Sequence, residues 1–231
     1  MCGRFTLRVS VSELAQLFLP EMQGAEIPKE DQPRFNIAPT QHVICVAGRG
    51  PGQAASLERW RWGLVPSWAN DVAVGNRMIN ARAETVDSKP SFRRAFVSRR
   101  CLIPADGFFE WKKVDGGKQP YLIEPAKGGV LAMAGLWESN QKATLDGSPI
   151  QTFTIITTVA NQMMSQLHHR MPVFLNEEAF DRWLDPAFRN TEQLKGLLAP
   201  VADDCLTMKP VSKRVNNPRN DDAQCVEPIM V

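Results

Sequence analysis

Seven short segments rich in β-branched and aromatic residues constrain the fold of this 231-residue chain more than any other feature. Such residues pack well on a pleated sheet, and glycine and proline clusters between them mark turns, as at residues 48–52 and 115–117. The sequence therefore predicts many short strands. They cover residues 42–46, 57–64, 102–104, 107–112, 121–124, 130–137 and 152–159.

Four short helices are predicted around these strands. Ser10 and Glu13 have the spacing of a capping box, and apolar residues follow at helical intervals. Asn176 is placed to cap a second helix, Thr191 opens a third, and a fourth covers residues 91–97. Because helices do not alternate regularly with strands, we expect an α+β fold rather than a doubly wound parallel sheet. We predict a curled or barrel-like, mostly antiparallel sheet with peripheral helices.

The chain shows no internal repeat, low-complexity run or linker, so residues 1–231 are predicted to form a single domain. The last roughly 15 residues either belong to that domain or form a tail. No apolar run approaches the ~18 residues that span a bilayer. The first residues also lack the charged start and apolar core of a secretory signal. We therefore expect a cytoplasmic protein with no membrane partner.

Cysteine and histidine usage argues against disulfide and metal chemistry. The five cysteines contain no CxxC pair, and an odd number fits a disulfide framework poorly. The three histidines do not form a zinc-type ligand cluster with them. We predict no metal and no other cofactor. Four of the cysteines are interpreted as small buried hydrophobes, and Cys2 is the exception.

The net charge is small, but the charges are unevenly distributed. Lys and Arg number 27 and Asp and Glu number 25, a balance that does not by itself indicate a nucleic-acid partner. Residues 93–118 nevertheless hold seven bases against three acids, and residues 209–220 hold four bases and no acid. If these segments fold onto one face they form a positive groove. Otherwise they are an ordinary solvated surface.

Cys2 follows the initiator methionine, whose removal leaves an amine and a thiol on adjacent carbons. An α-amino group has a reference pKa of about 7.7–8.0, against about 10.4 for lysine, so much more of it is free base at neutral pH. A free amine attacks an aldehyde to give an imine, and the nearby thiol then closes a thiazolidine ring. The same group can instead serve as an amino-terminal nucleophile for amide hydrolysis. A cysteine at this position is also compatible with no function.

Six sequence blocks then follow in order along the chain. They are MCGRF (1–5), RFNIAP (34–39), WGLVPSW (62–68), INARAET (79–85), CLIPADGFFEW (101–111) and HHRMP (168–172). This series resembles the SRAP family, the SOS response-associated peptidase proteins that act on abasic sites in DNA. The resemblance extends from residue 2 to about residue 212 and implies a single SRAP-like domain with a basic DNA-binding channel.

The resemblance also implies a reaction and its residues. Cys2 would form a thiazolidine crosslink with the ring-opened abasic sugar of single-stranded DNA through a Schiff base, with associated AP-lyase and crosslink-reversal activity. Asn80 would position the reactants, Glu110 would be the acid or base, and His168 would assist ring opening. Arg4, Arg82 and Arg170 would hold phosphates. Pro39 and Trp68 would line the DNA channel, and Ser212 would be a further DNA contact.

The chemistry of these side chains is consistent with such roles. An abasic sugar is mainly a closed hemiacetal, and histidine can hold and release a proton for its ring oxygen near neutral pH. A carboxyl among aromatic residues is a candidate for the second proton transfer, and an amide can donate and accept without changing charge. Each residue taken alone also has a structural interpretation. Glu110 can face solvent, Asn80 can sit in a turn, Arg82 can pair with Glu84, and the tryptophans can belong to the core.

Three hypotheses for function remain open. The first is an abasic-site sensor that crosslinks single-stranded DNA. The second is a thiol peptidase or amidohydrolase that uses Cys2 as its nucleophile, and the third is a non-covalent module for single-stranded DNA. A monomer is expected, because one domain can hold both a DNA channel and the covalent centre.

Overall fold

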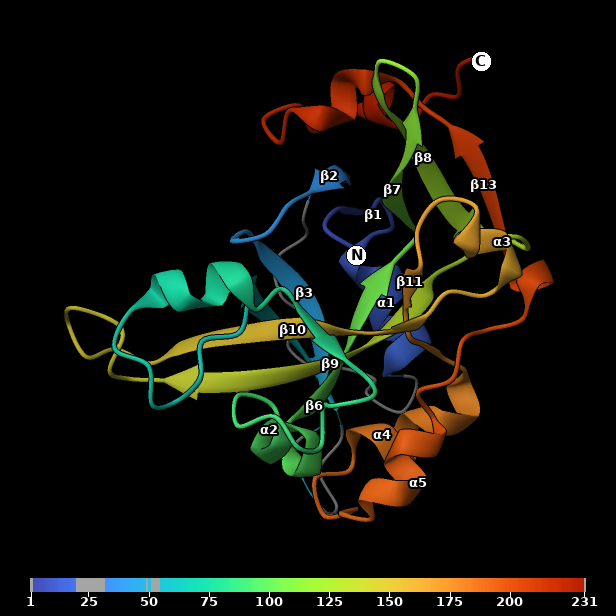
Figure 1. Ribbon diagram of the computed structural model, residues 1–231. Helices are drawn as coiled ribbons and strands as arrows, with labels where there is room; N and C mark the ends of the chain where they lie inside the picture. Colours follow the sequence, from blue (N-terminus) through green and yellow to red (C-terminus); the bar gives the residue numbers. More distant parts are fainter. Residues whose placement is uncertain (1, 20–31, 49, 51–54, 231) are drawn as a thin grey trace.

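The centre of the molecule is a closed five-stranded barrel, seen in a computed structural model that describes residues 2–19, 32–48, 50 and 55–230 (Figure 1). The strands follow the order β4 (Ser56–Trp62), β3 (His42–Ala47), β6 (Arg100–Ala105), β9 (Leu131–Asn140) and β10 (Ile150–Val159). Neighbours along this order are antiparallel. Strand β10 then closes the ring by pairing with β4 in parallel. The predicted barrel-like, mostly antiparallel sheet is confirmed.

Three short strands extend the barrel sheet beyond the ring. They are β5 (Asn80–Arg82), β11 (Arg170–Pro172) and β12 (Phe174–Leu175). Strand β5 runs parallel to β10 and β11 runs antiparallel to it, whereas β12 pairs with β9. These strands were not predicted from the sequence, because two or three residues carry too little periodicity. They matter because of what they bring together. Strands β5 and β11 belong to the INARAET and HHRMP blocks, and both pair with β10.

A second, fully antiparallel sheet lies against one end of the barrel (Figure 1). Its order is β13 (Leu206–Pro210), β8 (Gly117–Pro125), β7 (Gly107–Val114), β1 (Phe5–Leu7) and β2 (Arg34–Ile37). Strands β7 and β8 form a hairpin whose tip places Gly116 at a φ of 79°, a conformation that glycine adopts without steric cost.

A buried carboxylate joins the two sheets where β6 leads directly into β7. Asp106 is the single residue between these strands, and its side chain accepts hydrogen bonds from the hydroxyl of Thr6 and the backbone N–H of Arg8 (2.8 Å). The Arg8 guanidinium completes the arrangement with an ion pair of 3.0 Å. The chain therefore passes from the barrel to the second sheet at a point that is tied to β1.

The helices are short and peripheral. They are α1 (Val11–Phe18), α2 (Arg93–Ser98), α3 (Gln162–Ser165), α4 (Phe180–Leu184) and α5 (Thr191–Gly196). The predicted capping box at Ser10 and Glu13 is confirmed. Asn176 precedes a 3-10 turn that leads into α4, but its side chain makes no capping hydrogen bond there. The remaining 3-10 turns are η1 (Val72–Arg77), η2 (Glu177–Ala179), η3 (Asp203–Cys205), η4 (Lys213–Asn216) and η5 (Ala223–Cys225).

The core is built around fully buried aromatic side chains. Trp62 packs edge-on against Phe5 of the second sheet, with ring centroids 5.1 Å apart, and stacks with Phe153 of the barrel. Such rings bury large apolar areas and so stabilise both sheets together. All five cysteines are free thiols. The expectation that the four besides Cys2 are buried holds for three of them and is wrong for Cys205, which is exposed.

The carboxyl-terminal segment packs on the second sheet. Val211 bridges to Pro228, and the Cys225 side chain is buried. No helix in the described part of the chain is long and apolar enough to cross a membrane. Within that same part, no cluster of three or more His, Cys, Asp or Glu side chains is arranged to hold a metal ion.

A candidate active site in a basic groove

Cys2 lies buried just before β1, with 1% of its surface exposed. Its thiol points toward the carbonyl oxygen of Arg4 at 4.0 Å. Burial, together with the negative charge of Glu110, raises the pKa of the Cys2 thiol to about 12. The thiol is therefore protonated at neutral pH.

Asn80 connects the barrel to this cysteine. Pairing of β5 with β10, which sets Asn80 opposite Ile155, directs the Asn80 side chain at the amino terminus, where Nδ2 donates to the Cys2 carbonyl oxygen at 2.8 Å. The amide oxygen Oδ1 is buried and has no hydrogen-bond partner among the described residues. Because an unmet buried acceptor costs free energy, this atom is well placed to receive a hydrogen bond from a bound reactant.

Glu110 comes to the same place on β7, opposite Tyr121 of β8. Only 6% of its surface is exposed, so it is not the solvent-facing residue that one interpretation of the sequence allowed. One carboxylate oxygen accepts the backbone N–H of Trp111 at 3.3 Å. The charge of Glu110 acts on both Cys2 and His168, which places the carboxylate within electrostatic reach of both.

His168 lies in the loop between α3 and β11. Its Nδ1 accepts the backbone N–H of Arg170 at 2.9 Å, which leaves the proton of the neutral ring on Nε2. Burial lowers the pKa of His168 below its ordinary value, while the charge of Glu110 acts in the opposite sense. The ring stacks on His169 with centroids 4.3 Å apart.

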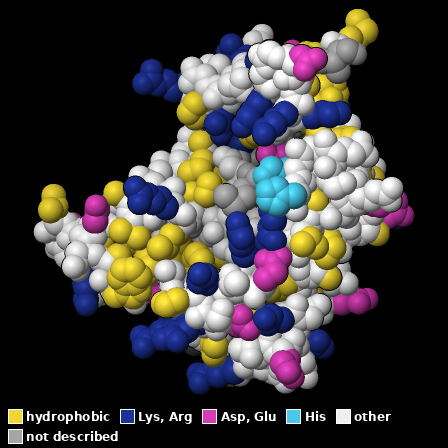
Figure 2. All heavy atoms as spheres, in the orientation of Figure 1, with side chains coloured by type: hydrophobic (Ala, Val, Ile, Leu, Met, Phe, Trp, Pro, Cys, Tyr) yellow, Lys and Arg dark blue, Asp and Glu magenta, His cyan; other side chains and the backbone are white. Residues whose placement is uncertain are grey.

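A groove of about 690 Å³ opens at Glu110 and His168, lined by the β7–β8 hairpin on one side and the α3–β11 loop on the other. A second hollow of about 470 Å³ adjoins it, sharing Trp111 and Lys118 and reaching Arg4 and η4. Four lysines line the two hollows, namely Lys112, Lys113, Lys118 and Lys213. Figure 2 shows several Lys and Arg side chains gathered on either side of the histidine atoms on this face.

The two basic segments of the sequence thus meet in part. The lysines of residues 112–118 line the groove, and Lys213 lines the second hollow, where it meets Lys118. The arginines of residues 93–100 instead lie on α2 and at the start of β6, away from the hairpin (Figure 1). The groove lysines were visible in the sequence only as a local excess of charge.

The three arginines expected at phosphates have different surroundings. Arg82 is exposed on β5, two residues after Asn80. Arg170 is 6% exposed, and its guanidinium binds Glu84 at 2.6 and 3.0 Å and the Thr157 carbonyl. Glu84 thus pairs with Arg170 of β11, a contact that the sequence analysis did not anticipate. Of Arg82 and Arg170, only Arg82 therefore presents its charge at the surface.

Arg4 has mixed surroundings. One guanidinium nitrogen donates to both Asn36 Oδ1 and the Val215 carbonyl at 2.7 Å, and the group lies 5.8 Å from the ring centroid of Trp111. Arg4 also lines the second hollow. It is therefore bound to the protein framework and still borders the groove.

The other expected DNA contacts lie on turns. Trp68 is 57% exposed after β4, whereas Trp60 and Trp62 are buried. Pro39 is half-buried between β2 and β3. The Ser212 hydroxyl accepts the backbone N–H of Arg214 at 3.2 Å and so caps η4.

Comparison with known proteins identifies the family of this chain. The family model described as SOS response associated peptidase (SRAP) matches residues 1–218. The chain belongs to the SRAP family. Its relatives include the abasic site processing protein YoqW of Bacillus subtilis (strain 168), 41% identical over 98% of this chain and 99% of that protein. They also include HMCES of Gallus gallus, 36% identical over 99% of this chain and 78% of that protein, and YedK of Escherichia coli (strain K12), 29% identical over 99% and 100%.

Solved structures agree on the fold. A protein from Bacteroides thetaiotaomicron superposes with a TM-score of 0.83 at 22% identity and covers 99% of this chain and 100% of its own. A phage-related protein from Bordetella bronchiseptica gives a TM-score of 0.72 at 30% identity, over 92% of this chain and 95% of its own. The fold of this chain is therefore shared by these two solved proteins.

Proposed function

We propose that this protein captures abasic sites in single-stranded DNA as a covalent adduct of Cys2. The observation that carries the proposal is the meeting of Cys2, Asn80, Glu110 and His168 beside a groove lined by lysines. These residues come from four separate segments, and each has a role in aldehyde chemistry. SRAP relatives from bacteria and a vertebrate carry names that refer to abasic site processing.

The chemical steps use the liberated α-amine of Cys2 first and its thiol second. After Met1 is removed, the amine nitrogen attacks C1′ of the ring-opened sugar, and the carbinolamine loses one water to give an imine. The thiol sulfur then adds to the imine carbon while its proton passes to the nitrogen, which closes the thiazolidine. A thiol with a pKa of about 12 supports this order, because it keeps its proton until the imine is present.

The surrounding side chains move protons and hold the reactants. His168 presents Nε2–H to the sugar ring oxygen, where a proton opens the hemiacetal. Glu110 takes a proton from the attacking amine and returns it to the departing hydroxyl. Asn80 fixes the Cys2 carbonyl through Nδ2 and offers its unpaired Oδ1 to the amine or a sugar hydroxyl.

The imine also accounts for the lyase and reversal activities included in the proposal. Removal of a proton from C2′ of the imine expels the 3′ phosphate, which cleaves the strand. Reversal of the thiazolidine runs the same proton transfers backwards and returns free Cys2. Glu110 is assigned to both, because its carboxylate lies within electrostatic reach of the Cys2 sulfur.

DNA binding in this proposal is electrostatic and independent of sequence. The groove lysines and the exposed Arg82 attract phosphates, so affinity falls as salt rises. Exposed Trp68 supplies an apolar surface for an unstacked base. In this scheme residues 1–231 act as a single domain and as a monomer, because both sheets contribute to one site. The protein is then associated with DNA in the cytoplasm.

The peptidase alternative is less well supported by the site. A cysteine hydrolase uses a thiolate, and such thiols have lowered pKa values, whereas the Cys2 thiol is buried and its pKa is raised. A simple DNA-binding module, for its part, has no need for the hydrogen bond between Asn80 and Cys2.

A denaturing gel tests the proposal. Purified protein is incubated with single-stranded DNA that carries one abasic site, without borohydride. We expect a heat-stable shifted band that is absent with undamaged DNA and absent in Cys2→Ala. A band that persists in Cys2→Ala rejects the thiazolidine, and hydrolysis of peptides with no reaction at the lesion favours the peptidase.

A further inference from the structure

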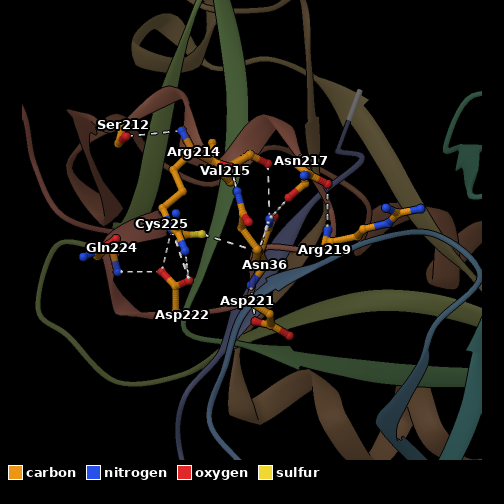
Figure 3. A network of polar contacts seen from close by, with 11 residues as sticks. Asn36, Ser212, Arg214, Val215, Asn217, Arg219, Asp221, Asp222, Gln224 and Cys225 are labelled. Atoms are coloured by element: carbon orange, nitrogen blue, oxygen red, sulfur yellow. Dashed lines mark hydrogen bonds and ion pairs between the residues drawn. The ribbon is translucent and has the colours of Figure 1, made fainter.

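The RFNIAP block has no role in the chemistry above, yet it contains a buried side-chain amide that makes four hydrogen bonds to the rest of the chain. Asn36, in β2, is fully buried, and its Oδ1 accepts from Arg4 at 2.7 Å. Its Nδ2 donates to the carbonyls of Val215 (3.2 Å), Asn217 (3.1 Å) and Asn220 (2.6 Å) (Figure 3). Two N–H groups thus serve three carbonyls, which a carboxylate or an apolar side chain cannot do.

Asp221 makes the reciprocal connection from the carboxyl-terminal segment back to β2. Its carboxylate accepts the backbone N–H groups of Phe35 and Asn36, the latter at 2.9 Å, and pairs with the Arg34 guanidinium. Bonds of this kind to a charged acceptor are stronger than neutral ones. Asp221 lies beyond residues 1–218, so it falls outside the part of the chain that matches the family model.

This segment contacts a neighbour of each reactive group, Arg4 on the Cys2 side and Trp111 on the Glu110 side. The Val215 carbonyl accepts from Arg4, whose own carbonyl lies 4.0 Å from the Cys2 sulfur. On the other side, the Asn216 side chain accepts the indole N–H of Trp111 at 2.7 Å, and Trp111 follows Glu110 directly. The segment therefore spans from the Cys2 side of the site to the Glu110 side.

We propose that residues 212–221 form a brace, fixed by Asn36 and Asp221, that holds Cys2 and Glu110 at the separation their reaction requires. Asn36 and Asp221 are positioning residues, because they act through Arg4 and Trp111 and contact no reacting atom. The proposal deepens the function proposed above and rests on it for the reaction that is measured. Small displacements of reacting groups are costly in rate, so loosening the brace slows the crosslinking step itself.

A pair of neighbouring aspartates provides the test. Asp221→Ala removes the carboxylate that holds β2, whereas Asp222→Ala removes one that pairs with exposed Arg214 and caps η5. Both substitutions raise the net charge by one, so their electrostatic effects on DNA affinity are matched. The crosslinking rate is measured at saturating abasic DNA, where weaker binding no longer contributes.

We expect Asp221→Ala to lower this saturated rate about tenfold or more, and Asp222→Ala to change it less than about twofold. Asp221→Asn keeps an oxygen for the two backbone N–H groups and is expected to recover the rate to within about threefold of wild type. Equal rates in all variants, or equal losses in both alanine variants, overturn the proposal. A fall in thermal midpoint for Asp221→Ala with an unchanged saturated rate also overturns it, because the segment is then only structural.

A second readout does not depend on abasic DNA. Maleimide labelling of each cysteine is followed by peptide mass spectrometry, with exposed Cys205 as the internal standard. A loosened brace exposes Cys2, so its labelling is expected to accelerate about tenfold in Asp221→Ala and to stay unchanged in Asp222→Ala. If wild-type protein forms no DNA adduct, the proposed function fails while this labelling ratio still tests the brace. Unchanged Cys2 labelling in Asp221→Ala contradicts the brace whatever the DNA result.

Discussion

The barrel and the groove wall are held by different forces. The barrel interior is apolar, and its aromatic rings, such as those of Trp62 and Phe153, pack without exposed surface. The wall formed by η4 and the carboxyl-terminal segment has only a small apolar cluster, which includes Val215 and Cys225, and adds to it amide and carboxylate hydrogen bonds centred on Asn36 and Asp221. The comparison indicates that the barrel supplies the stability of the molecule, while directional polar bonds set the positions of the reactive groups.

Removal of a barrel ring has the largest expected effect on stability. Phe153→Ala leaves a cavity beside Trp62, and we expect the free energy of unfolding to fall by about 3–5 kcal/mol. Val159→Ala, on the same strand but exposed, is the control and is expected to change it by less than about 0.5 kcal/mol. Chemical denaturation measures both. A small loss for Phe153→Ala shows that the barrel is not the main source of stability.

Removal of the Glu110 carboxylate is expected to affect the reaction rate rather than the stability. Glu110→Gln keeps the shape of the side chain but cannot transfer a proton, so the crosslinking rate at saturating DNA is expected to fall about 100-fold. Affinity for undamaged single-stranded DNA is expected to change little. Rapid quench followed by a denaturing gel gives the rate, and fluorescence anisotropy gives the affinity. A loss that appears only in affinity removes Glu110 from the chemistry.

Neutralising groove lysines has a smaller effect, confined to binding. Lys118→Ala and Lys213→Ala each remove one charge that lines the second hollow. We expect a few-fold weaker DNA affinity and a salt slope lower by about one in each, with the saturated rate unchanged. Lys142→Ala, an exposed lysine in the turn between β9 and β10, is the matched control. Equal weakening by the control points to net charge rather than the groove.

The smallest effect concerns the protonation of His168. Its pKa is lowered by burial, so an NMR titration is expected to give a midpoint below 6.5. Glu110→Gln is expected to lower the midpoint further, because the carboxylate favours the charged ring. Between the lowered value and 6.5 the unfolded chain binds more protons, so the free energy of unfolding decreases as pH falls through that window. A midpoint above 6.5 contradicts the described surroundings of His168.

Local patterns in the sequence predicted the parts of the fold that local forces decide. The strand segments and the Ser10–Glu13 capping box depend on residues close together in the chain, and the structure has them. Closure of the barrel by parallel β10 and β4 has no local signal, because it joins residues about ninety positions apart, such as Thr152 and Arg61.

The same distinction applies to the site. Cys2 is recognisable from its position after Met1 together with the six sequence blocks, since both are local features of the chain. The surroundings of Arg170 and Asn36 cannot be recognised in this way, because partners far apart in the chain decide them. Arg170, for example, is buried and paired with Glu84, 86 positions away. Polar residues of one type therefore look alike in sequence and differ in the folded protein.

Mass spectrometry of the digested DNA adduct tests the central claim most directly. The account predicts an amino-terminal peptide that lacks Met1 and carries the sugar on Cys2, with both the amine and the thiol consumed. An adduct on another residue, or Met1 still attached in material that has reacted, would contradict it.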